Sequence, residues 1–168
     1  HQLQNKPKED AFTQKENGKW VSLSTKNFVE KAQKYSTGLH ALGIQKGDRV
    51  AIISNNRTEW HLTDLALQHL GVVTVPIYTN ITPSDYEYIL NDCGAVAVFI
   101  SSDDIIEKVN SIKDKVASLN HVYTFDEVPG EKHYAELVQE ANLAAIQEVR
   151  ETIQGDDVAT FIYTSGTT

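Results

Sequence analysis

Short runs of β-branched and apolar residues alternate along most of this chain with longer segments of helical periodicity. The runs that are typical of strands are residues 49–54, 72–76, 95–100 and 121–123. Strands joined through intervening helices pair in parallel, and the helices then cover the faces of the sheet. The alternation therefore predicts an α/β fold, with a largely parallel sheet and helices on both faces.

The ends of the helical segments carry recognisable sequence signals. Ser24 is suited to cap a helix over residues 25–42, with Gly43 as its stop. Thr82 and Pro83 are suited to open a second helix that ends near Gly94. The remaining helices are expected over about residues 58–70, 105–116 and 134–153, the last in one or two pieces.

The chain begins with a hairpin signal. Residues 11–15 and 20–23 alternate like strands, and the segment between them contains Asn17-Gly18, a pair that favours tight hairpin turns. We therefore expect a small antiparallel hairpin at the amino terminus, outside the parallel sheet.

The last residues combine an apolar run with a hydroxyl-rich loop. Residues 157–163 read as a buried strand, and Thr164, Ser165, Gly166, Thr167 and Thr168 follow it directly. Hydroxyls donate hydrogen bonds to phosphate oxygens, and glycine allows close approach of backbone N–H groups. The same composition also suits a solvated turn. Taken alone, the composition favours the solvated turn, although the loop would lie at the carboxyl ends of the strands, where parallel sheets bind their ligands.

Composition limits the classes of function. A net charge of −8, without a basic cluster, argues against a nucleic-acid surface. The single cysteine, Cys93, fits a reducing compartment, so a cytoplasmic location is expected. The most apolar region, residues 60–78, is interrupted by polar residues and should not span a membrane, and the first residues lack the apolar core of a signal peptide.

Other residues that carry chemistry have simpler structural explanations. His40, His61 and His69 lack the spacing of metal ligands, and Cys93 lacks the surroundings of a nucleophile, so structural roles are expected and no metal site is assigned. The pairs at 103–104 and 156–157 are acidic, which suits a helix start and a turn. The glycine motifs of dinucleotide-binding and classical P-loop proteins are absent.

The segment Tyr163-Thr164-Ser165-Gly166-Thr167-Thr168 resembles the start of the phosphate-binding loop of the adenylate-forming superfamily. That family, which includes acyl-CoA synthetases, luciferases and peptide-synthetase adenylation domains, continues the loop with Gly-x-Pro-Lys-Gly. Residues 47–60, 71–78 and 88–95 are similar to bacterial long-chain fatty-acid:CoA ligases, which usually carry proline where this chain has Thr58. The resemblance extends over about residues 21–168.

The resemblance implies a ligase that converts a fatty acid to acyl-AMP and then to acyl-CoA, with ATP, Mg²⁺ and coenzyme A. Thr164, Ser165, Gly166, Thr167 and Thr168 would bind the ATP phosphates, while the family's catalytic residues and lid would lie beyond Thr168. Residues 1–168 would then be the amino-terminal part of an AMP-binding domain, inactive alone. The expected partners are fatty acid, ATP and coenzyme A, with no nucleic acid and no transmembrane segment; peripheral association with a membrane stays open.

Two alternatives remain at this point. An aryl-CoA ligase or a peptide-synthetase adenylation domain would share the loop and differ in the acid that it activates. A non-catalytic α/β module for nucleotide binding or protein interaction would share only the fold. Acyl chain length and oligomeric state are not readable from these residues.

Overall fold

A computed structural model describes residues 2–16, 18–101 and 103–164 of the chain. Its centre is a four-stranded sheet in the order β4-β3-β5-β6. The strands are β3 (Arg49–Ile53), β4 (Val73–Ile77), β5 (Ala97–Ile100) and β6 (His121–Thr124). Each neighbouring pair is parallel, so the predicted α/β fold with a parallel sheet is confirmed.

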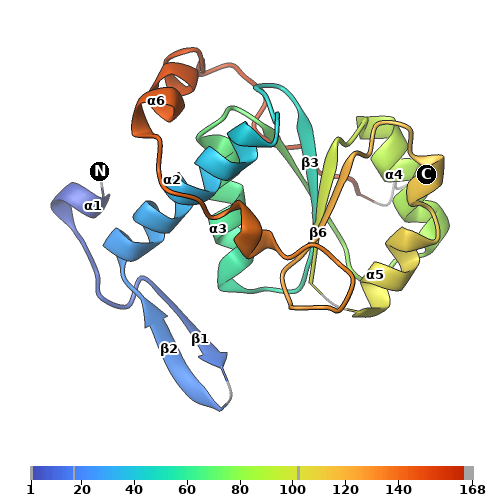
Figure 1. Cartoon of the computed structure of the whole chain (residues 1–168), viewed down its shortest axis with the longest axis horizontal. Coiled ribbons are helices and arrows are strands. Elements are labelled where there is room, and N and C mark those ends of the chain that lie inside the picture. The colour runs from blue at the N-terminus through green and yellow to red at the C-terminus, as the bar shows by residue number, and fades with distance from the viewer. Residues whose placement is uncertain (1, 17, 102, 165–168) are drawn as a thin grey trace.

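Helices cover both faces of this sheet (Figure 1). On one face lie α2 (Thr25–Ala41), α3 (Thr58–Gln68), the short 3₁₀ helix η2 (Tyr134–Leu137) and α6 (Leu143–Glu151). On the other lie α4 (Pro83–Cys93), α5 (Asp103–Asn110) and the 3₁₀ helix η1 (Lys113–Lys115). The sheet is therefore the middle layer of three.

Strand β3 shows why the sheet needs both helical layers. Val50 and Ile52 point into the core under α2 and α3, whereas Ala51 and Ile53 point into the core under α4 and α5. All of these side chains are completely buried. Burying a large aliphatic side chain contributes about 1.5–3 kcal/mol, so the continuous apolar pattern of β3 is stable only when both faces are covered.

The two ends of α4 follow the sequence signals. Thr82 accepts a hydrogen bond from the Asp85 backbone N–H, and the Asp85 carboxylate accepts one from the Thr82 backbone N–H, which forms a capping box before Pro83. At the other end, Gly94 adopts φ 63° and ends the helix. Arg49 then donates from Nε to the Cys93 carbonyl at 2.6 Å, a contact that no local pattern indicated.

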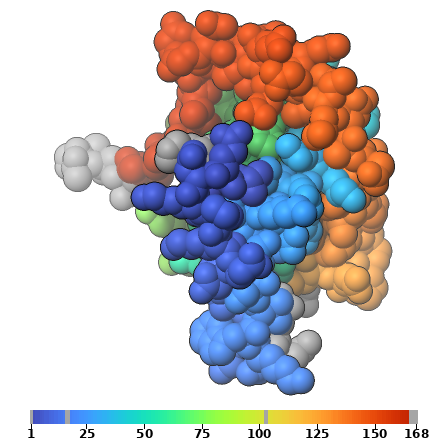
Figure 2. Space-filling model, turned by 90° about the vertical axis from the view of Figure 1, so that its left-hand side faces the viewer, coloured from blue at the N-terminus to red at the C-terminus, as the bar shows by residue number. Residues whose placement is uncertain are grey.

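The amino-terminal hairpin is confirmed, and it projects away from the three layers (Figures 1 and 2). Strand β1 (Phe12–Glu16) pairs antiparallel with β2 (Lys19–Leu23). Phe12 stacks on Phe28 of α2, with 4.1 Å between the ring centroids, and anchors the hairpin at its base. Of the predicted turn, Asn17 lies outside the described residues, and Gly18 has φ 81°.

Some boundaries differ from the sequence predictions. A short helix, α1 (Gln2–Asn5), precedes the hairpin and was not predicted. The helix expected through residue 116 ends at Asn110 and is followed by η1, and the segment expected at 134–153 divides into η2 and α6. The sequence also favours Ser101 and Ser102 as caps of the helix that follows them, but Ser102 lies outside the described residues. Within the described part of the chain, none of the helices has both the length and the apolar character needed to cross a membrane.

Candidate functional site

The segment that leads to Thr164 runs along the outer edge of β4. The Thr74 backbone N–H donates to the Ala159 carbonyl at 3.0 Å, and the Phe161 N–H donates to the Thr74 carbonyl at 3.1 Å. A parallel bridge joins Thr74 and Thr160, and the Thr160 hydroxyl also donates to the Thr74 carbonyl. These bonds continue the sheet in the parallel direction and carry the chain toward the carboxyl ends of its strands.

The prediction that residues 157–163 form a buried strand was wrong. Only one bridge forms, and the side chains of Val158 and Ile162 are 54% and 69% exposed. The segment has β4 on one side, and the described residues place no further strand on the other. An apolar run alone does not distinguish a central strand from an edge segment, because both positions accept β-branched side chains.

The start of the segment is fixed by a charged turn. The Asp157 carboxylate accepts a hydrogen bond from the Gln154 backbone N–H at 2.7 Å and pairs with Lys46 Nζ at 2.6 Å. Both contacts lower the pKa of Asp157, the backbone bond most strongly. The turn role expected for this aspartate is confirmed.

Two adjoining pockets lie at the carboxyl ends of β3 and β4. Their volumes are about 450 and 400 Å³, and they share Pro76, Ile77, Tyr78 and Tyr163 as a common wall. The larger pocket extends to Tyr88 and Ile89 on α4 and includes Thr164. Pockets of this size accept small ligands, and this edge is where parallel sheets bind them.

The smaller pocket is lined by neutral polar groups. After β3 the chain contributes Ser54, Asn55 and Asn56, and after β4 it contributes Thr79. None of the described residues that line this pocket is acidic. Side-chain amides and hydroxyls offer hydrogen bonds without negative charge, so the pocket's chemistry suits an anion.

Tyr163 is tied to α4 immediately before the hydroxyl-rich loop. Its hydroxyl donates to Asp92 Oδ2 at 2.5 Å, across 71 residues of sequence. Burial raises the pKa of Tyr163 well above its ordinary value, and the hydrogen bond to Asp92 raises it further. The bond fixes the position from which Thr164 and the following residues start.

We expect the replacement Asp92→Asn to lower the pKa of Tyr163, because the asparagine oxygen accepts the hydrogen bond without a negative charge. Raising a phenol's pKa favours its neutral form in the folded state. The raised pKa of Tyr163 therefore contributes to the free energy of unfolding in full below the ordinary tyrosine pKa of about 10. This contribution is lost as the pH rises through the pKa of Tyr163 in the folded protein. Carbon NMR of the labelled Tyr163 ring across an alkaline titration measures the shift.

The matched control is Asp114→Asn, which removes an exposed carboxylate on η1. An equal change in both variants would mean that general charge, rather than the bond to Asp92, sets the pKa of Tyr163.

The structure describes one of the five predicted loop residues. Thr164 is exposed and lines the larger pocket at the expected edge of the sheet. Ser165, Gly166, Thr167 and Thr168 lie outside the described residues, so their phosphate-binding role stays a prediction. Sequence reasoning missed Asp92 and Asn55; no local signal marks them, because each reaches the site only when its helix or strand is packed.

The other candidates occupy structural positions. The ring of His69 is held by a contact of 3.0 Å between Nδ1 and the Ser36 hydroxyl, and burial together with the charge of Arg150 lowers its pKa to about 4. Cys93 is free and buried, and burial raises its pKa. Among the described residues, no group of three or more His, Cys, Asp or Glu side chains could hold a metal ion.

The fold and the edge pockets define an α/β protein with two adjoining pockets at the carboxyl ends of its parallel strands. Comparison with known families is more specific: the model of the AMP-binding enzyme family matches residues 1–168. The chain belongs to that family.

Curated relatives include a long-chain-fatty-acid–CoA ligase, FadD15 of Mycobacterium bovis, which is 33% identical over 162 residues. The match covers 90% of this chain and 26% of FadD15. ACSBG1 of Rattus norvegicus, which has the same ligase description, is 28% identical over 162 residues, with 92% of this chain and 22% of that protein covered. The chain therefore spans about a quarter of the length of these relatives.

Solved structures give the same fold. A Mycobacterium tuberculosis fatty acyl CoA synthetase matches with a TM-score of 0.72 and 28% identity, covering 86% of this chain and 28% of that one. The inhibitor-bound N-terminal domain of FACL13 from the same organism matches with a TM-score of 0.73 and 29% identity, covering 88% of this chain and 35% of that one. The layered sheet described above is the N-terminal fold of adenylate-forming enzymes.

Proposed function

We propose that the full protein is an ATP-dependent ligase that activates a long-chain fatty acid as acyl-AMP and then transfers the acyl group to coenzyme A. The observation that carries the proposal is the path of residues 159–164. The chain belongs to the AMP-binding family. Its residues 159–164 follow the outer edge of β4, so that Thr164 lies at the carboxyl ends of the strands. Family relatives described as long-chain ligases support the substrate class.

The residues at the smaller edge pocket fit a nucleotide phosphate chain, whereas the larger pocket also contains Asp85. Asn55 and Thr79 offer neutral donors, and no described lining residue of the smaller pocket is acidic. ATP would supply the electrophilic phosphorus and the pyrophosphate leaving group. Thr164 and the hydroxyls after it would hold the phosphates in line with the acid, since positioning and charge stabilisation dominate phosphoryl transfer. Mg²⁺ would neutralise the charge that develops on the phosphates.

Domain boundaries and location follow from the same proposal. Residues 1–168 would form the first part of the AMP-binding domain, and the acyl pocket and a lid domain would come from the rest of the protein. The free, buried thiol of Cys93 is compatible with the proposed cytoplasmic location.

The substrate class is tested with an acid series from acetate to stearate. In the full protein, we expect kcat/KM to rise about fourfold with each methylene buried in an apolar tunnel, equivalent to about 0.8 kcal/mol, until the tunnel is full. Carboxylate-dependent exchange of pyrophosphate into ATP is the assay for the first step, and thioester formation is the assay for the second.

Each alternative gives a different result in these assays. Preference for benzoate or an amino acid over palmitate would identify an aryl-CoA ligase or a peptide-synthetase adenylation domain. If the full protein is folded but exchanges pyrophosphate into ATP with none of the acids, it is a non-catalytic module. The proposal requires exchange with long-chain acids and a thioester product.

A further inference from the structure

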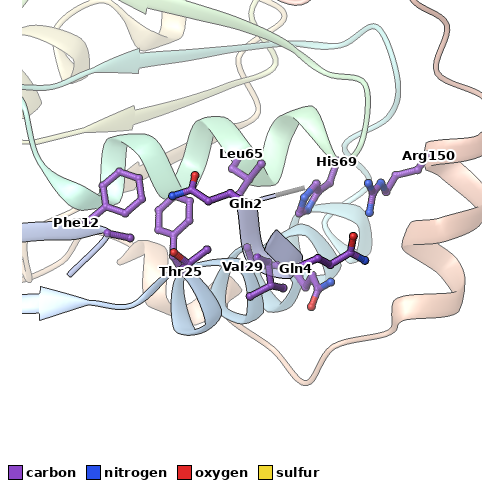
Figure 3. Close-up of a pocket in the computed structure, with 12 residues that line it drawn as sticks. Gln2, Gln4, Phe12, Thr25, Val29, Leu65, His69 and Arg150 are labelled. Carbon is purple, nitrogen blue, oxygen red and sulfur yellow. The ribbon is translucent and has the colours of Figure 1, made fainter. Parts of the chain in front are cut away.

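A pocket of about 490 Å³ lies on the helical face that carries α2 and α3, and none of its lining residues also lines an edge pocket (Figure 3). It is formed between α1, the start of β1, the outer sides of α2 and α3, and α6. The volume is within the range of small-molecule sites, about 300–1,000 Å³. None of its lining residues belongs to the proposed phosphate site.

The lining of this pocket mixes apolar side chains with the neutral polar side chains of Gln2, Gln4, Thr25 and Gln33, and its charged group lies at one end. Figure 3 shows Phe12 at one end, Leu65 and Val29 along the middle, and His69 and Arg150 at the other end. No described residue that lines the pocket is acidic, although the chain has a net charge of −8. The pocket is therefore amphipathic, with its positive charge at one end.

Arg150 is the charged group of the site. Its guanidinium makes no ion pair or hydrogen bond within the described residues, so all of its donors remain for a ligand. An arginine fork matches the two oxygens of a carboxylate, and such charge-assisted bonds are stronger than neutral ones. A single anionic group of a ligand would therefore pair with the Arg150 guanidinium at this end of the pocket.

The His69 ring forms part of the pocket wall beside Arg150 and carries no charge. The Ser36 hydroxyl has a single proton, and it contacts the carbonyls of Ala32 and Ala66 at 2.7 and 3.1 Å. The His69 Nδ1–H therefore donates to Ser36 Oγ, and the ring is neutral at physiological pH because burial and the charge of Arg150 lower its pKa to about 4. One net positive charge beside the apolar side chains of Val29 and Leu65 suits a monoanion with a hydrocarbon body.

We propose that this pocket binds an amphipathic monocarboxylate of medium chain length, with the carboxylate on Arg150 and the hydrocarbon along Val29 and Leu65 toward Phe12. The site is separate from the one where the acid substrate would react. It does not depend on the proposed ligase activity, because every element that forms it belongs to the described chain.

The test is equilibrium dialysis of labelled dodecanoate against the full protein, with an acyl-adenylate analogue present to fill any substrate site. We expect saturable binding that Arg150→Gln weakens about tenfold or more, as loss of a charge-assisted hydrogen bond predicts. Shortening the acid should weaken binding about fourfold per methylene. Dodecanol and inorganic phosphate should bind far more weakly than dodecanoate.

Two further variants complete the test. Arg150→Lys keeps the positive charge and should retain part of the affinity, whereas Lys26→Gln removes an exposed cation of α2 that lies outside the pocket lining and should leave binding unchanged. Arg150 is exposed and unpaired within the described chain, so its variants should keep the wild-type midpoint of thermal unfolding. Binding that is unchanged by Arg150→Gln, or that disappears when the analogue is added, would overturn the proposal.

Discussion

Replacing Thr164, Ser165 or Thr167 by alanine in the full protein should lower kcat for adenylate formation about 10- to 150-fold each. The expected loss is about 1.5–3 kcal/mol per hydroxyl, the range for a hydrogen bond to a charged group, because these donors would meet charge that develops on the leaving pyrophosphate. The measurement is pyrophosphate exchange with saturating palmitate and ATP, with kcat and KM determined separately.

The matched control for the loop is Thr13→Ala, which removes an exposed hydroxyl on the hairpin. It should leave kcat unchanged, although it removes a contact of 2.9 Å with the Ser22 hydroxyl. If all three loop variants turn over like this control, the loop is only a turn and the phosphate assignment fails. If KM for ATP rises and kcat is unchanged, the hydroxyls bind the ground state and the transition state equally well.

Gly38→Ala should destabilise the folded chain by at least about 3 kcal/mol, at the upper end of overpacking costs. A Cβ at Gly38 would lie 1.8 Å from the backbone oxygen of Leu137, and the Leu137 carbonyl carbon would be 2.6 Å away. Neither backbone group can move by rotating a side chain, so α2 and η2 must separate. The opposing gain in helix propensity is only about 1 kcal/mol.

Urea denaturation measures this effect, with Gly155→Ala as the control. Gly155 has no atom within 4 Å of an added Cβ, so its replacement should be neutral or stabilise the chain by up to about 1 kcal/mol through the unfolded state. Equal midpoints for the two variants would show that the contact between α2 and η2 is not close enough to need glycine.

The sequence by itself determined the order and type of most elements. Strand β3 and helix α4 illustrate the reason. The pattern of β3 is apolar on both faces, which only a covered sheet satisfies, and the ends of α4 are set by Thr82, Pro83 and Gly94 through bonds to neighbouring residues. Local signals of this kind are present before the chain folds.

Only the tertiary structure decided how the site is assembled. Residues 157–163 have the composition of a buried strand, yet their position on the free side of β4 leaves Ile162 exposed. Asp92 meets Tyr163 across 71 residues, and Arg150 reaches the pocket beside His69 only because α6 packs against α2. These contacts depend on how whole elements pack, so no spacing along the sequence encodes them. The sequence therefore indicates the chemistry of the loop, whereas the contacts that position the loop, such as the one between Asp92 and Tyr163, follow from the fold.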